Sequence, residues 1–185
     1  MKVEKCQCGY ISKKKKLDFI WLLVCVVVAV GIFLTGYLWM KTRANVFTVL
    51  AVLMVLPAAK RVVALVVMVP KKSVSKERYE KIKEAAGECT LFADYVFTSA
   101  EKIMHLDFVV IKNGNVLGVI APPRQDVEYM KKYLTDSVQK NDSSYHVRVV
   151  DSDEKLVKEL GRLTQKEVSL EKEEKVVNYL RTLAV

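Results

Sequence analysis

One uncharged apolar run, from Phe19 to Met40, limits what this chain can fold into more than any other feature. It is as long as the roughly 20 helical residues that cross the hydrocarbon core of a bilayer. Trp21 and Trp39 lie near its two ends, where aromatic side chains favour the membrane surface. The run is longer than the apolar part of a signal peptide, and no small-residue cleavage site follows it. The sequence therefore predicts a transmembrane helix over about 19–40.

A second apolar stretch begins at Val46 and predicts a second transmembrane helix over about 46–66. Lys60 and Arg61 interrupt it. At about 1.5 Å per residue, Lys60 is roughly 20 Å from the outer end, so we expect both cations to snorkel to the cytoplasmic boundary of the roughly 30 Å core. Pro57 predicts a kink just before them. The alternative is that the two cations line a transport path in an oligomeric assembly.

The positive charge of the chain is concentrated beside these two spans. The net charge is +9, and residues 1–69 hold 10 basic against 2 acidic residues, whereas residues 70–185 hold 20 against 19. The basic residues next to the spans are Lys13, Lys14, Lys15, Lys16, Lys71 and Lys72. This distribution predicts a multi-pass protein of the cell membrane with both termini in the cytoplasm and anionic lipid as a partner. A nucleic-acid partner is disfavoured, because it requires positive charge on the folded domain.

The four cysteines form no disulfide framework. Cys6 and Cys8, followed by Gly9, look like half of a zinc knuckle. A structural zinc site takes four ligands, usually in Cys-x2-Cys pairs, so we expect a short reduced tail and no cofactor. A zinc ion shared between two chains is the alternative.

The rest of the chain predicts one small cytoplasmic domain of the α+β class with a largely antiparallel sheet. Its expected elements are a helix at 73–86, strands at 89–98, 104–111 and 116–121, a helix at 125–139, a strand at 145–150, and helices at 153–163 and from 164 onwards. The expected organisation is a basic tail (1–17), a two-helix transmembrane hairpin (18–70) and an αβββαβ-type domain with extra C-terminal helices (71–185).

This order of elements is similar to the core of the restriction-endonuclease-like (PD-(D/E)xK) superfamily, and residues 106–117 (LDFVVIKNGNVL) look most like its nuclease-related NERD branch. The resemblance implies a magnesium-dependent nuclease core in which Asp107 matches the first metal-binding acid. Gln125 and Tyr129 fall in the Gln-x3-Tyr spacing of some members. Ile120 and Pro122 stand where the second acid and the lysine belong, so the resemblance implies a copy without the catalytic set.

Three functions therefore compete. The first is a membrane-anchored, non-enzymatic module that binds another protein or copies of itself. The second is a membrane-tethered nuclease or nucleic-acid-binding protein that uses Asp107, although a carboxylate in this pattern is also typical of a helix cap or an edge strand. The third is a subunit of an oligomeric transport assembly. Asp94 lies in an apolar strand, and the sequence names no partner for it.

Overall fold

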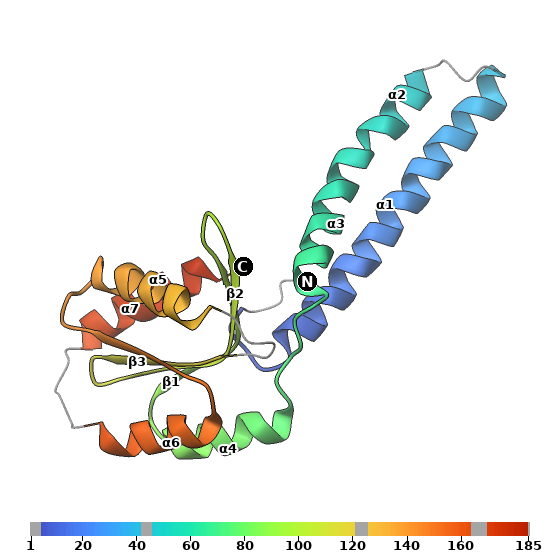
Figure 1. The fold of residues 1–185 in the computed structure, drawn as a ribbon. Coiled ribbons are helices and arrows are strands. Elements are labelled where there is room, and N and C mark those ends of the chain that lie inside the picture. The colour runs from blue at the N-terminus through green and yellow to red at the C-terminus, as the bar shows by residue number, and fades with distance from the viewer. Residues whose placement is uncertain (1–4, 42–45, 121–125, 164–169, 185) are drawn as a thin grey trace. The chain divides into compact units, whose positions relative to one another are not determined.

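The computed structural model describes residues 5–41, 46–120, 126–163 and 170–184. The chain is a mixed α+β protein with two N-terminal apolar helical segments and a small four-stranded sheet (Figure 1). It divides into two compact units. One unit is Ile11–Lys72, and the other combines Ser73–Val185 with the N-terminal residues up to Tyr10. We describe them as the hairpin unit and the α/β unit.

The hairpin unit consists of α1 (Tyr10–Met40), followed by α2 (Val46–Leu53) and α3 (Val55–Met68). The two segments run antiparallel, because Asp18 of α1 contacts Arg61 of α3 and Trp39 of α1 stacks on Phe47 of α2. Both segments are long and apolar enough to cross a membrane. Their large apolar side chains point outwards, and Trp39 is 78% exposed. This inside-out pattern suits a lipid environment.

The helix boundaries of the hairpin differ from the expected ones in two places. The first helix begins at Tyr10, nine residues before the expected start of the span, so the basic residues at 13–16 are helical. The second segment is interrupted at Met54, between α2 and α3, and not immediately before Lys60. Pro57 explains the position of the break: it has no N–H for the carbonyl of Leu53, four residues earlier, and its ring crowds that carbonyl.

The α/β unit follows the element order expected from the sequence. Its elements are α4 (Lys76–Ala86), β1 (Thr90–Thr98), β2 (Ile103–Lys112), β3 (Asn115–Ile120), α5 (Val127–Gln139), β4 (His146–Val150), α6 (Asp153–Arg162) and α7 (Leu170–Leu183). The strand order is β1-β2-β3-β4. The first three strands are antiparallel neighbours, and β4 pairs with β3 in parallel through the crossover helix α5.

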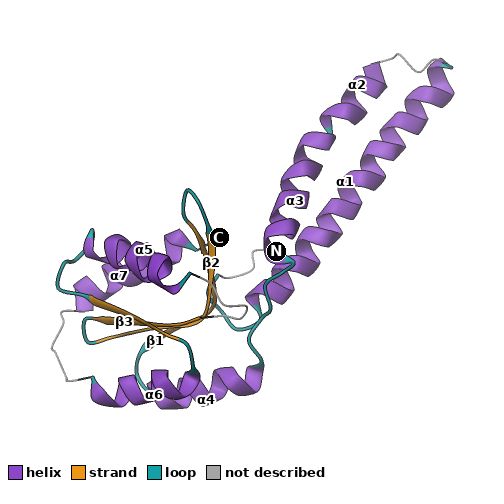
Figure 2. Ribbon diagram, in the orientation of Figure 1, coloured by secondary structure: helices purple, strands orange, loops and turns teal. Residues whose placement is uncertain are grey.

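Helices cover both faces of the sheet (Figure 2). Ile82 of α4 and Leu156 of α6 pack on one face, in a buried cluster that includes Phe108. Met130 and Leu134 of α5 pack on the opposite face; that larger buried cluster also takes in two residues of α7, Val176 and Leu180. The regular alternation of strand side chains produces these two faces. The unit therefore has a packed core on each side of the sheet.

Local sequence signals explain most of the element ends. Asn113 and Gly114 have φ values of 48° and 72°, as a two-residue hairpin turn requires. Asp126 accepts a hydrogen bond from the Tyr129 N–H and caps α5. Asp151, with Glu154 three residues later, predicts a helix cap at Asp151. This prediction is wrong, because Ser152 caps α6 by accepting from the Lys155 N–H. The expected helix start at residue 164 lies outside the described residues.

Candidate functional site

The resemblance singles out Asp107, which lies on β2 where the strand is irregular. The pairing of β2 with β3 shifts between Leu106 and Phe108. On the other side of β2, the pairing with β1 steps from Ala93–Phe108 to Tyr95–Leu106. Asp94 is the residue of β1 passed over by this step, and its φ is 52°. The irregularity therefore places two carboxylate residues on neighbouring strands at the same level of the sheet.

Arg78 connects Asp107 to a second acid. The Arg78 side chain extends from α4 and donates one hydrogen bond to the Asp107 carboxylate. It also donates two hydrogen bonds to the carboxylate of Asp153, the first residue of α6, in a bidentate pair; one of the two, from Nη2, is 2.7 Å long. Its guanidinium lies 5.2 Å from the ring centre of Phe108. One cation thus joins a strand and two helices on the same face of the sheet.

Two members of this group have shifted pKa values; we call the group the Arg78 cluster, and it consists of Arg78, Asp94, Asp107 and Asp153. Burial raises the pKa of the Asp107 carboxyl above its ordinary value; Arg78 opposes the rise, while Asp153 and Asp94 add to it. The pKa of Arg78 is raised, chiefly by its hydrogen bonds to Asp153. The ion pair therefore holds Arg78 in its charged form without fully offsetting the cost of burying the Asp107 carboxylate.

Asp94, the fourth member of the cluster, holds the segment that leads into α4. Its carboxylate accepts a hydrogen bond from the Ser73 hydroxyl and another from the Val74 N–H at 2.8 Å. Asp94 is 1% exposed, so these donors compensate a buried charge. The sequence did not identify them, because Asp94 is about 20 residues away from both along the chain.

The other residues implied by the resemblance do not join Asp107. Tyr129 packs against the core on the opposite face of the sheet, and its hydroxyl donates to Ser99 Oγ at 2.9 Å. Ile120 pairs with Leu106 and supplies no carboxylate. Gln125 and Pro122 lie outside the described residues. The structure thus brings Asp107 together with Arg78, Asp153 and Asp94, a set that sequence spacing gave no signal for.

The two N-terminal cysteines separate onto different faces of the sheet. Cys6 belongs to the core beneath α5 and α7, and burial raises the pKa of its thiol to about 11. Cys8 packs against the core beneath α4 and α6, where its thiol contacts the Val74 carbonyl at 3.7 Å. A protonated thiol is a poor metal ligand. Within one chain, these cysteines therefore do not converge on a common ion.

The hairpin unit carries an ion pair that the sequence reasoning missed. Arg61 Nη1 lies 3.0 Å from Asp18 Oδ1, and its guanidinium is 5.9 Å from the ring centre of Trp21. Measured from the Trp39–Phe47 contact at 1.5 Å per residue, Asp18 is about 10 Å further along the hairpin than Arg61. The arginine side chain therefore extends away from the loop between the helices, which is the direction that snorkelling requires.

Most of the other predicted membrane-interface residues lie at the end of the hairpin away from the loop between its helices, whereas Lys60 lies inside the second segment. Lys15 Nζ donates to the Val69 and Lys71 carbonyls and so satisfies backbone groups at the end of the second segment. Lys60 is exposed, as is Lys72. The remaining basic residues, Lys13, Lys14 and Lys16, lie along the first turns of α1. The basic residues at 13–16, together with Lys71 and Lys72, give this end of the hairpin a collar of positive charge beside exposed apolar side chains.

The chemistry available in the described parts of the chain is limited. Among the described residues, no group of three or more His, Cys, Asp or Glu side chains is arranged to hold a metal ion. Comparisons with models of protein families, with curated proteins and with solved structures find no match to this chain. The function must therefore be argued from the Arg78 cluster and the hairpin themselves.

Proposed function

We propose that this chain is a membrane-anchored, non-enzymatic module whose α/β unit binds another protein. One observation carries the proposal: Asp107, the candidate catalytic carboxylate, is bound by the guanidinium of Arg78. A magnesium ion would need that carboxylate and further hard oxygen ligands. Arg78 provides the opposing charge from within the protein and also links α4 to α6 through Asp153. Such a cluster stabilises a fold, because each of its carboxylates is bound to a donor of the protein.

The hairpin is the anchor in this proposal. Its two helical segments expose apolar side chains over the length of a bilayer core, and Asp18 and Arg61, which lie within them, offset each other's charge. The basic collar favours the cytoplasmic leaflet, which carries anionic lipid. We therefore place both termini and the α/β unit in the cytoplasm, with the bilayer and a second protein as partners.

A nuclease is the second candidate, and one observation favours it. Asp94 stands level with Asp107 on the neighbouring strand and supplies a second carboxylate that the sequence motif lacks. Against this, Asp94 is already bound by Ser73 and Val74. A nuclease would have to release both carboxylates from protein donors before they held a metal.

The experiment that separates these two functions is a hydrolysis assay. Full-length protein purified in detergent would be incubated with DNA or RNA and Mg²⁺, beside Asp107→Asn and a control at exposed Asp136 of α5, Asp136→Asn. We expect no hydrolysis by any of the three proteins and no salt-sensitive binding of nucleic acid. Hydrolysis that only Asp107→Asn abolishes would overturn the proposal. A pull-down from detergent-solubilised membranes then identifies the partner.

Transport through an oligomer is the third possibility, and it rests on Lys60 and Arg61. The pairing of Arg61 with Asp18 supports an anchoring role, because the cation is neutralised inside the hairpin. Ion flux through vesicles that contain the protein tests this point. We expect none, and neutralising Lys60 and Arg61 together should leave the background flux unchanged.

A further inference from the structure

The edge of β1 that faces away from β2 has one backbone position that is hydrogen-bonded and a neighbouring position with which no described strand pairs. β1 is the first strand in the sheet order, and the Ala93 N–H points away from β2 and donates to the Cys6 carbonyl at 3.0 Å. Backbone groups alternate in direction along a strand, so the N–H and C=O of Leu91 point the same way. No described strand pairs with Leu91 on this side. Among the described residues, the part of this edge at Leu91 therefore has room for a further extended segment, whereas Phe97, further along β1, is paired with Ala184.

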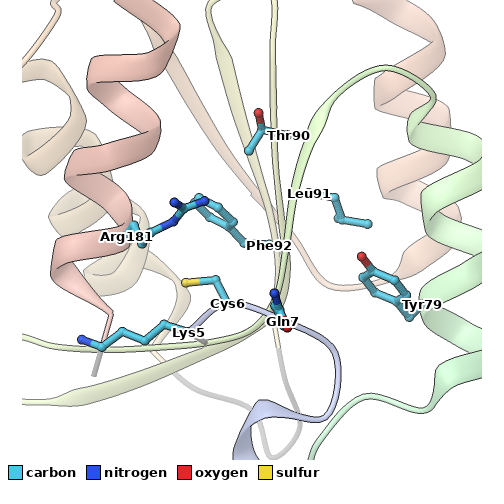
Figure 3. Close-up of a pocket in the computed structure, with 8 residues that line it drawn as sticks. All are labelled: Lys5, Cys6, Gln7, Tyr79, Thr90, Leu91, Phe92 and Arg181. Atoms are coloured by element: carbon cyan, nitrogen blue, oxygen red, sulfur yellow. The ribbon is translucent and has the colours of Figure 1, made fainter. Parts of the chain in front are cut away.

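A cavity of about 480 Å³ lies along this open position (Figure 3). Its walls come from both faces of the sheet: Tyr79 of α4 is on one side of the strand and Arg181 of α7 is on the other. Leu91 points towards Tyr79, whereas Phe92 points towards Arg181. We call this cavity the edge slot. A strand added here would direct alternate side chains towards α4 and towards α7.

The charge of the edge slot is positive and lies on the α7 side. Lys5 and Arg181 both line the slot, and none of its lining residues is acidic. Lys5 Nζ donates to the Ala184 carbonyl at 2.5 Å, and the Arg181 guanidinium is 5.9 Å from the ring centre of Phe92. Both cations lower the pKa of the Cys6 thiol, although burial raises it by more. An anionic side chain is therefore favoured on this side of an added strand.

We propose that the edge slot binds an extended, acidic peptide segment of the partner protein, which adds a strand to β1 and directs a carboxylate towards Arg181 and Lys5. The inference rests on the proposed function, since it names the docking site and the partner chemistry of the same module. Main-chain hydrogen bonds to Leu91 supply affinity, and the two cations supply specificity. A second copy of this chain fits less well, because edge-to-edge pairing would bring the same cations together.

A charge-reversal experiment tests the proposal on the full-length protein in nanodiscs. The probe is a fluorescein-labelled hexapeptide in which glutamate and valine alternate, with binding followed by fluorescence anisotropy. We expect Arg181→Glu and Lys5→Glu each to weaken binding at least about fivefold, since an attraction becomes a repulsion. The matched control is exposed Lys175 of α7, and Lys175→Glu should leave the affinity unchanged. A peptide with lysine in place of glutamate should bind the two charge-reversed variants more tightly than it binds the wild-type protein.

A backbone test leaves the protein unaltered, so misfolding of a variant cannot explain its result. Two versions of the peptide carry N-methyl groups on alternate amides, in one register or the other. Strand addition predicts that the register facing β1 loses at least about tenfold in affinity, because it loses donors to the edge, and that the other register binds as before. Equal effects in both registers, or none in either, would overturn strand addition.

The remaining outcomes are also decisive. If Arg181→Glu binds the peptide as tightly as wild type does, the edge slot is not the binding site. If millimolar inorganic phosphate alone displaces the peptide, the edge slot is a simple anion site. Self-association of the wild type that Arg181→Glu alters, without peptide binding, assigns the edge to a second copy instead. If the Arg181→Glu variant still captures a partner protein from membranes, the proposed function stands but the edge slot is not the docking site. Hydrolysis that depends on Asp107 would remove the proposed function itself.

Discussion

The two units of this chain each contain an arginine–aspartate pair, and the pairs differ in their surroundings. In the hairpin unit, the Asp18 side chain is 3% exposed and Arg61 is 44% exposed. In the α/β unit, the Asp107 side chain is 5% exposed and Arg78 is 35% exposed. The local geometry is thus similar. The hairpin, however, turns its apolar side chains outwards, whereas the α/β unit buries them on both faces of a sheet.

The two pairs also differ in how many structural elements each of them connects. Arg61 joins two helices through one carboxylate. Arg78 joins a strand to two helices through two carboxylates, and it lies against Phe108 in the core. We therefore expect the α/β unit to lose more stability than the hairpin when its arginine is removed.

The largest expected effect comes from Arg78→Met, which keeps the apolar stem but removes the charge. Asp107 would then be a buried carboxylate without a cation, and we expect a loss of about 2–4 kcal/mol in the free energy of unfolding, at the lower end because Arg78 is partly exposed. Urea titration with pulse proteolysis of the full chain in detergent measures it. Arg148→Met is the matched control, because Arg148 forms a more exposed pair with Glu159. Equal losses in the two variants would contradict the central position of Arg78.

A smaller effect is expected in the hairpin. Arg61→Leu leaves the covered Asp18 without its cation and should cost about 1–2 kcal/mol of helix association, because membrane-embedded polar contacts are worth little more. Asp18→Leu should cost less, since the more exposed Arg61 can turn towards water. The double variant should recover most of the loss. Reversible unfolding in SDS measures all three, and strictly additive losses would show that the pair does not interact.

An effect of about 1 kcal/mol is expected from Tyr95→Phe on the other face of the sheet, where one buried hydrogen bond is lost. The Tyr95 hydroxyl donates to the Leu180 carbonyl at 2.8 Å and attaches α7 to β1. Hydrogen exchange by mass spectrometry should show faster exchange in α7 and unchanged exchange in α4. Faster exchange in both helices would mean that the two faces of the sheet are not independent.

The smallest effect is the pH dependence of Asp107. Because its pKa is raised by burial, the folded state binds this proton more tightly than the unfolded state. The stability it contributes is therefore fully present below the ordinary aspartate pKa, roughly 4, and falls as pH rises through the raised value. Wild type should lose stability relative to Asp107→Asn over this interval, as urea titrations across the pH range would measure. If the stability difference between wild type and Asp107→Asn stays constant as the pH rises, or grows in favour of wild type, the pKa of Asp107 is not raised in the folded state.

Much of the fold follows from local sequence patterns. Asn113 and Gly114 predict the turn between β2 and β3, which their positive φ values confirm. The helical spacing of Val176 and Leu180 predicts one face of the last helix, and both residues are buried. Local sequence patterns could not predict the Arg78 cluster, because Arg78 is 29 residues from Asp107 and 75 from Asp153 along the chain.

Other features have only a weak signature in the sequence, or none. The positive φ of Asp94 arises from tertiary contacts and has no local signature. Asp18 immediately precedes the apolar run and so lies outside the uncharged stretch from Phe19 to Met40. An acidic residue at the end of one span and a basic residue inside the next was the available signal for the Asp18–Arg61 pair.

The central proposal is that both helical segments enter the bilayer and keep the α/β unit in the cytoplasm. Labelling of single introduced cysteines in intact cells with a membrane-impermeant maleimide tests it most directly, with the wild type as the background. We expect Lys41→Cys, in the loop between the spans, to be labelled from outside, and Lys140→Cys, on the α/β unit, only after permeabilisation. Labelling of Lys140→Cys in intact cells, or release of the protein from membranes without detergent, would contradict the account.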